Sequence, residues 1–238
     1  MRKWLKRYVD PWLPLYYIVP FVVSVSLNTV VYYGTQWLTR DWNHWNMETF
    51  LDRKIPLIPE FTGIYFLFFL FCTVSHIVIA HQGKELAFQF IASDMLSRLI
   101  CGFFFIVLPT TNIRPMGMGT GLGADMLRLL YDMDYPVNLF PSIHCLASWM
   151  CFVAVRSSRR LPLWYKWVTG VIAGLICFST LAVKQHVIAD VAAGIFLAEV
   201  LMFFSAKIHW YGWIERKMEH LSCRIFGREN IEESEKNL

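Results

Sequence analysis

Charged residues are scarce in this sequence, because Asp, Glu, Lys and Arg together make up only 17% of its 238 residues. A soluble domain carries charge on about a quarter of its residues. By contrast, 56% of the residues are hydrophobic and 16% are aromatic. The composition therefore disfavours a soluble domain, and the length allows about six membrane-spanning helices of roughly 20 residues each and little more.

Two further shortages argue against other classes of protein. The formal net charge is only +4, which is too small to indicate binding to a nucleic acid. The six cysteines include no CxxC pair and mostly lie inside apolar runs. We therefore expect buried thiols instead of a disulfide framework or a zinc site. No cluster of residues is typical of a metal site, and we expect neither a metal nor a cofactor.

The hydrophobic runs predict an all-α bundle of six transmembrane helices within residues 1–209. The first run follows a basic segment and lacks a small-residue cleavage site, so we interpret it as a signal anchor that is retained. The six predicted spans are residues 12–34, 61–80, 86–108, 141–155, 163–183 and 186–208. Residues 210–238 are predicted to form a cytoplasmic tail that is amphipathic at first and disordered from Gly227 onward.

The distribution of Lys and Arg predicts the orientation of the bundle. With the N-terminus inside, most cations fall in cytoplasmic segments, among them Arg156, Arg159 and Arg160. Cytoplasmic loops carry this excess of positive charge. Both termini are then cytoplasmic, and the segments before the fourth and sixth spans face outward. The sequence has no N-x-[ST] sequon, which is compatible with a bacterial plasma membrane, the location we expect.

The two long connections on the outer side have different patterns. Residues 35–59 contain three tryptophans, which predicts an interfacial segment that anchors the chain in the membrane. In residues 110–140, one face of a possible helix is apolar and comprises Leu122, Met126, Leu129, Leu130 and Met133. This amphipathic helix is either a lid at the membrane interface or a segment packed on the bundle, and the pattern leaves both open.

Three charged residues lie within predicted spans. Asp94 and Arg98 are spaced i,i+4 in the third span, and Glu199 lies at a comparable depth in the sixth. Charges at such depth normally face protein and find partners. We expect an ion-pair cluster that holds the third and sixth spans together, in preference to a path for protons or substrate.

The pattern that indicates chemistry combines two histidines and a carboxylate. His186 and Asp190 are spaced i,i+4 at the start of the sixth predicted span. The carboxylate can accept the proton of one ring nitrogen, which leaves the other free as a nucleophile or base. His144 starts the fourth span, and two crossings separate it from His186. The two imidazoles therefore return to the same membrane face, where His144 can serve as a general acid.

Other features near these residues favour a bound phosphate. Two helices begin there, and helix N-termini attract anions through free N–H groups and the helix dipole. Ser142 adds a hydroxyl in the first turn, while Arg114 and Lys184 can neutralise phosphate oxygens. The set predicts phosphoryl transfer through a phosphohistidine.

These motifs resemble those of the type 2 phosphatidic acid phosphatase superfamily, which comprises membrane lipid phosphatases and phosphotransferases. That family shows K-x6-RP, PSGH and SR-x5-H-x3-D. The matching residues here are Arg114-Pro115, Pro141-Ser142-Ile143-His144, Ser179-Thr180, His186 and Asp190. The resemblance covers roughly residues 86–201, the expected catalytic core.

The resemblance implies a six-span fold and metal-independent hydrolysis of a lipid phosphate. It assigns His186 as the nucleophile, Asp190 as its partner and His144 as the acid. By position it also adds Ser179 to the residues that bind phosphate.

Three departures from the family's motifs affect the expected activity. Val107 stands where the family has lysine, Thr180 where it has arginine and Ile143 where it has glycine. Lys184 is our candidate for one of the two absent cations. Loss of these cations also resembles the branch of sphingomyelin and inositol-phosphorylceramide synthases, which transfer a head group to a lipid hydroxyl.

The leading hypothesis is a lipid phosphate phosphatase that acts at the outer membrane face. Candidate substrates are phosphatidic acid, phosphatidylglycerol phosphate and a polyprenyl diphosphate, and the sequence does not choose among them. The first alternative is a head-group phosphotransferase. The second is a non-catalytic lipid-binding or transport protein that uses Asp94, Arg98 and Glu199 as its polar path. The sequence does not predict an oligomeric state.

Overall fold

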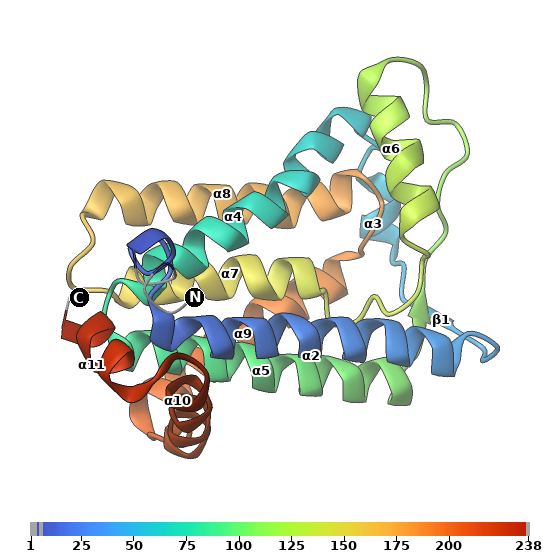
Figure 1. Cartoon of the computed structure of the whole chain (residues 1–238). Helices are drawn as coiled ribbons and strands as arrows, with labels where there is room; N and C mark the ends of the chain where they lie inside the picture. The colour runs from blue at the N-terminus through green and yellow to red at the C-terminus, as the bar shows by residue number, and fades with distance from the viewer. Residues whose placement is uncertain (1–3, 5–6, 237–238) are drawn as a thin grey trace.

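Helices make up nearly all of the ordered structure in the computed structural model, which describes residues 4 and 7–236 (Figure 1). Among these residues, five helices are long and apolar enough to cross a membrane. They are α2 (Leu15–Thr39), α4 (Thr62–Ala80) with the 3-10 turn η1 (Pro59–Phe61) before it, α5 (Lys84–Val107), α8 (Leu163–Ala182) and α9 (Ile188–Lys207). The all-α fold and five of the predicted spans are therefore confirmed as apolar helices.

The predicted fourth span corresponds to α7 (Ile143–Ser157), which is shorter than the others. A helix of 15 residues is about 22 Å long, whereas the hydrocarbon core of a bilayer is roughly 30 Å thick. Helix α7 packs against α8, α9 and α4, and most of its residues are buried. It thus lies at the centre of the bundle, where it packs against four of the five candidate spans, α4, α5, α8 and α9.

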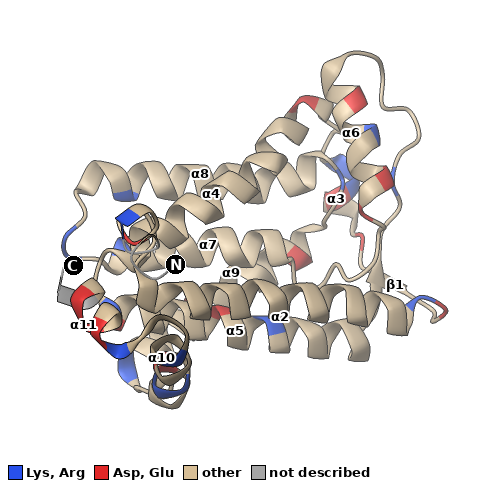
Figure 2. Ribbon diagram, in the orientation of Figure 1, with Lys and Arg blue, Asp and Glu red and all other residues tan. Residues whose placement is uncertain are grey.

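The charged residues lie mainly at the two ends of the bundle, and the residues between the ends are mostly uncharged. Figure 2 shows most Lys, Arg, Asp and Glu at the two ends of the bundle, with few between them. Helices α10 (Gly212–Phe226) and α11 (Arg228–Lys236) lie at one end, and α3 (Phe50–Lys54) and α6 (Leu122–Met133) lie at the other (Figure 1). An apolar middle with charged ends is the arrangement that a bilayer favours.

The two outer connections are joined to each other and to the bundle. Strand β1 (Trp45–Asn46) pairs in parallel with β2 (Thr110–Thr111). Helix α6 packs on η1 and α4, which selects the packed alternative for this segment. Its buried side chains are Ala124, Leu127 and Leu130, whereas Leu122, Leu129 and Met133 are exposed. The predicted apolar face was therefore only partly correct, because α6 has apolar residues on two sides.

The C-terminal tail differs from the prediction. Residues from Gly227 onward were expected to be disordered, yet residues 228–236 form α11. Ile231 is buried, and the hydroxyl of Ser234 donates to Asp10 while accepting from the backbone N–H of Leu15. The contacts of Ser234 with Leu15 at the start of α2 and with Asp10 before it therefore offset the polar composition of the segment. The last two residues of the chain lie outside the described residues.

The three charged residues predicted within spans form two separate groups, and only Asp94 and Arg98 are buried. Arg98 pairs with Asp94, and Asp94 also accepts a hydrogen bond from Ser24 of α2. Glu199 instead accepts hydrogen bonds from Trp149 and Arg156 of α7. The predicted single cluster between α5 and α9 is wrong, because Glu199 faces α7 and the Asp94 pair faces α2.

Helices α7 and α9 approach each other closely at Gly194. A Cβ at this position would lie 2.8 Å from the backbone oxygen of Ser142 and 3.1 Å from the backbone nitrogen of Leu146. These are backbone atoms that cannot turn away, so a side chain here would push the two helices apart.

We therefore predict that Gly194→Ala lowers the stability of the protein in detergent. Overpacking of this kind costs about 1–3 kcal/mol, which lowers Tm by several degrees in a thermal unfolding experiment. The control is Gly174→Ala in α8, where a Cβ would have no described atom within 4 Å. Alanine favours a helix more than glycine does, so the control should keep or raise Tm. Equal effects of the two changes would contradict this explanation.

Candidate active site

His144 and His186 meet at the end of the bundle that carries α3 and α6. His144 is the second residue of α7, and His186 lies in the turn between α8 and α9. Helix α7 leads away from this end and α8 leads back to it (Figure 1), as the predicted hairpin requires. The centroids of the two imidazole rings are 6.1 Å apart. This separation leaves room for a reacting group between them.

Asp190 orients the ring of His186. Its Oδ2 lies 3.2 Å from Nδ1 of His186 and 3.0 Å from the backbone nitrogen of Val187. Asp190 is fully buried and His186 is 8% exposed. Helix α9 begins at Ile188, so His186 precedes the helix instead of starting it, and Asp190 reaches back from the first turn. Within the described part of the chain nothing hydrogen-bonds Nε2 of His186, which leaves that nitrogen as the reactive one.

Helix α4 packs aromatic side chains against His144. The ring centroids of Tyr65 and Phe68 each lie 4.5 Å from that of His144. The hydroxyl of Tyr65 is 3.4 Å from Nδ1 of His144. Aromatic packing and this polar contact together restrict the orientation of the imidazole. Sequence analysis did not find Tyr65, because nothing in an apolar span indicates which of its aromatic residues faces a catalytic group.

Both histidines border a large cavity between α2 and α4. Its volume is about 600 Å³, within the range of roughly 300–1,000 Å³ for sites that bind organic ligands. Aromatic and aliphatic side chains such as Phe21, Val25 and Phe69 form much of its wall. The reactive histidines therefore lie beside a space that suits hydrocarbon chains.

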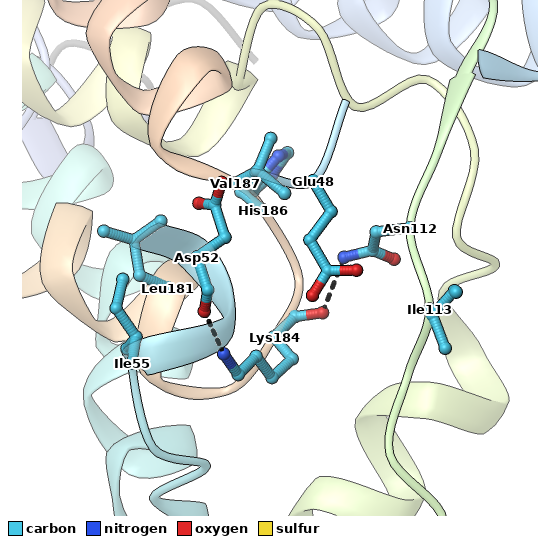
Figure 3. Close-up of a pocket in the computed structure, with 9 residues that line it drawn as sticks. All are labelled: Glu48, Asp52, Ile55, Asn112, Ile113, Leu181, Lys184, His186 and Val187. Carbon is cyan, nitrogen blue, oxygen red and sulfur yellow. Dashed lines mark hydrogen bonds between the residues drawn. The ribbon is translucent and has the colours of Figure 1, made fainter. Parts of the chain in front are cut away.

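His186 also borders a second, small cavity, drawn in Figure 3. Its volume is about 10 Å³, close to the minimum that holds one water molecule. Lys184 extends its amino group to the backbone oxygen of Asp52 at 2.7 Å, and Asn112 donates to the backbone oxygen of Lys184 at 2.8 Å (Figure 3). Lys184 has a left-handed backbone with φ of 54°. Such a conformation is unfavourable for a residue with a side chain, and these two contacts stabilise it.

Asp52 is a residue of this site that the sequence analysis missed. Its Oδ1 accepts a hydrogen bond of 2.7 Å from the backbone nitrogen of Ile188, so its carboxylate caps the start of α9. Its other oxygen accepts hydrogen bonds from Thr49. The T-x-x-D pattern of Thr49 and Asp52 signals the start of α3, but local sequence does not indicate a second helix as the partner.

The environment of Asp52 lowers the pKa of its carboxyl. Burial raises this pKa. Hydrogen bonds from Thr49 and Ile188 and the charge of Lys184 lower it, and their combined effect is the larger one. The carboxylate is thus held in its charged form at the positive end of the α9 dipole. The carboxylate of Asp52 therefore occupies the N-terminus of α9, one of the two helix ends where the sequence predicted a bound phosphate.

Arg114 supports the site from outside the two cavities. Its guanidinium donates to Oε1 of Gln185 at 2.5 Å and to the backbone oxygen of Tyr131 at 3.2 Å, and it stacks on the Tyr131 ring at 4.4 Å. Burial lowers the pKa of Arg114, although Asp134 and Tyr131 act in the opposite direction. Arg114 therefore positions the residue next to His186, and it does not border either cavity.

The hydroxyls of Ser142 and Ser179 are also directed away from the cavities. Ser142 is the N-cap of α7, where its oxygen accepts from the backbone nitrogen of Cys145. Ser179 donates to the backbone oxygen of Ile176 within α8. Both residues are fully buried. Of the predicted residues, the structure brings His144, His186, Asp190 and Lys184 to one end of the bundle. The hydroxyls of Ser142 and Ser179 instead form hydrogen bonds with the backbone of their own helices.

We predict that Asp52→Ala destabilises the protein at neutral pH. Loss of a helix cap costs about 1–2 kcal/mol, measured as a lower Tm in detergent. Because the folded-state pKa of Asp52 is lowered, its stabilisation is complete above the ordinary carboxyl pKa of about 4 and is lost as pH falls through the lowered value. The difference in Tm between wild type and variant should therefore shrink in acid.

The control for this experiment is Asp41→Ala. Asp41 lies in the same outer connection, and its side chain is exposed and paired with exposed Arg40. Exposed pairs contribute little, so Tm should hardly change. A Tm difference for Asp52→Ala that stays constant between pH 7 and pH 3 would refute the role of the charged carboxylate.

Comparisons of this chain with protein-family models, curated proteins and solved structures found no match. The resemblance to the phosphatidic acid phosphatase superfamily therefore rests on the short motifs alone. Their histidines and aspartate meet at one end of the bundle, and in the part of the chain that the structure describes no group of His, Cys, Asp or Glu side chains is arranged to hold a metal ion.

Proposed function

We propose that this protein is an integral-membrane lipid phosphate phosphatase that works through a phosphohistidine. The observation that carries the proposal is the placement of His186, oriented by Asp190, opposite His144 at the border of a cavity of about 600 Å³. A nucleophile, its orienting carboxylate and a second imidazole are the groups that such a reaction needs. The bilayer-length helices around them supply access to lipid.

In the first step, Nε2 of His186 attacks phosphorus while the bond from phosphorus to the lipid oxygen breaks. His144 donates a proton to that oxygen, and the lipid alcohol leaves. Asp190 accepts the hydrogen bond from Nδ1 and stabilises the positive charge that develops on the ring. The product of this step is a phosphoryl group bonded to His186.

In the second step, His144 removes a proton from water, and the water oxygen attacks phosphorus. The bond from phosphorus to nitrogen breaks, its electron pair returns to Nε2, and inorganic phosphate is released. Both histidines border the large cavity, whereas His144 does not border the small one, so the attacking water must lie in the large cavity.

The proposed orientation places the active site on the extracytoplasmic side. Helices α10 and α11 lie at the end of the bundle opposite α3 and α6 (Figure 1). The excess of Lys and Arg in the segments at that end supports a cytoplasmic location for it. The lipid phosphate would then be bound from the outer leaflet.

We predict that purified protein in detergent with EDTA releases inorganic phosphate from at least one lipid phosphate in a panel. His186→Ala should abolish release, since it removes the nucleophile. His144→Gln and Asp190→Asn should lower the rate by about 10²–10⁴-fold, the usual range for loss of an acid–base group. His220→Ala serves as the control, because His220 is exposed on α10, and its rate should match wild type.

The same panel separates the alternatives. Undiminished release by His186→Ala would refute the phosphohistidine. If wild type releases no phosphate but moves the head group to an added lipid alcohol, the protein is a phosphotransferase with the same first step. Absence of both reactions, with lipid binding unaffected by His186→Ala, would indicate a non-catalytic lipid-binding protein.

A further inference from the structure

The large cavity contains charged groups that the proposed reaction does not use. Asp94 and Arg98 of α5 are 5% and 6% exposed and both border this cavity. Asp94 is satisfied, because it accepts hydrogen bonds from Arg98 and from Ser24. Arg98 is not, since its Nε and Nη1 have no hydrogen-bond partner among the described residues.

Helix α2 supplies a third polar group with free hydrogen-bonding capacity. Asn28 borders the cavity, and its buried Oδ1 also lacks a partner in the described part of the chain. Asn28 follows Ser24 by one helical turn, so it lies on the same face of α2 as the contact with Asp94. Buried polar groups are nearly always hydrogen-bonded. If Arg98 and Asn28 only joined α2 to α5, the free donors of Arg98 and the free Oδ1 of Asn28 would therefore be unexpected.

The depth of these groups can be estimated along α2. Tyr32 contacts Asp134 of the outer connection, and both border the cavity near its mouth. Ser24 lies eight residues deeper, a distance of about 12 Å along the helix. Arg98 is one turn closer to the mouth than Asp94. The free groups therefore lie deeper along the bundle than Tyr32, on the wall of the cavity that the histidines also border.

Charge decides which kind of ligand group fits there. Arg98 and Asp94 already neutralise each other, so an anion bound at this depth would be an uncompensated charge in apolar surroundings. An uncharged oxygen can accept from Nε and Nη1 of Arg98 without that cost. Ester carbonyls, amide carbonyls and hydroxyls have this property, whereas an isoprenoid chain does not.

We propose that Arg98 and Asn28 bind the uncharged ester, amide or hydroxyl group that joins a lipid's chains to its phosphate. The site then selects glycerolipid-type or sphingoid-type phosphates over polyprenyl phosphates. This inference rests on the proposed function, because it takes the phosphate to lie at His186. The cavity thus has three zones: histidines for the phosphate, Arg98 and Asn28 for the linker, and aromatic walls for the chains.

The kinetic test compares dioleoyl phosphatidic acid with its diether analogue, which keeps the chains but lacks carbonyl oxygens, and with geranylgeranyl phosphate. Wild type should favour the diester in kcat/KM by about tenfold. Arg98→Lys keeps the charge and the pair with Asp94 but loses the planar fork of donors. It should raise KM for the diester about tenfold, change kcat little and leave the other two substrates unaffected.

Asn28→Ala provides a second variant that leaves the ion pair intact. Because the free Oδ1 of Asn28 can only accept a hydrogen bond, this variant should raise KM for ceramide phosphate, whose amide N–H and hydroxyl are donors, and leave KM for the diester unchanged. A wild type without preference for the diester would overturn the proposal. So would an Arg98→Lys variant that loses activity equally on all three substrates, because a merely structural role predicts uniform loss.

A binding measurement keeps this test separate from that of the proposed function. Dioleoylglycerol, its diether analogue and geranylgeraniol are added to His186→Ala protein in detergent, and Tm is measured. Dioleoylglycerol should raise Tm more than the other two alcohols do. In the double variant with Arg98→Lys, the three alcohols should raise Tm equally. If wild type hydrolyses no lipid phosphate, the proposed function is refuted. The proposed binding of the linker by Arg98 and Asn28 is tested separately, and it is refuted if the three alcohols shift Tm equally.

Discussion

The buried carboxylate of Asp190 connects the parts of the molecule on which the site depends. It accepts hydrogen bonds from the ring of His186 and from the backbone of Val187, and the backbone oxygen of Asp190 accepts from the nitrogen of Ser142. One residue therefore joins the turn before α9 to the first turn of α7. The close contact of Gly194 with the backbone of α7 keeps the two helices at this separation. The distance between the two imidazoles follows from these backbone contacts.

The polar groups around His186 are largely engaged with the protein itself. Asp52 caps α9, Lys184 donates to the backbone of α3, and Arg114 supports Gln185. These contacts link the outer connections to the turn that carries His186. They explain how a turn with a strained residue at Lys184 keeps a defined shape. They also give the segments that carry α3 and Arg114 a structural role in holding this turn.

The bundle combines an apolar exterior with a polar interior at two depths. The histidines lie at the end that carries α3 and α6, and Asp94, Arg98 and Asn28 lie on the wall of the same cavity. Charges inside a membrane protein are costly unless they are paired or serve a ligand. Here the pair is neutral, but in the part of the chain that the structure describes Nε and Nη1 of Arg98 have no hydrogen-bond partner.

The sequence by itself determined the features that depend on local spacing and composition. Apolar runs placed the helices, the i,i+4 spacing joined His186 to Asp190, and the hairpin brought His144 to the same end. Hydrophobicity does not specify how each helix is rotated about its axis. The partner of Glu199, the buried face of α6 and the cap that Asp52 places on α9 were therefore decided only by tertiary packing. Those contacts join residues distant in sequence, and their energy depends on which side chains the packed helices bring within hydrogen-bonding distance.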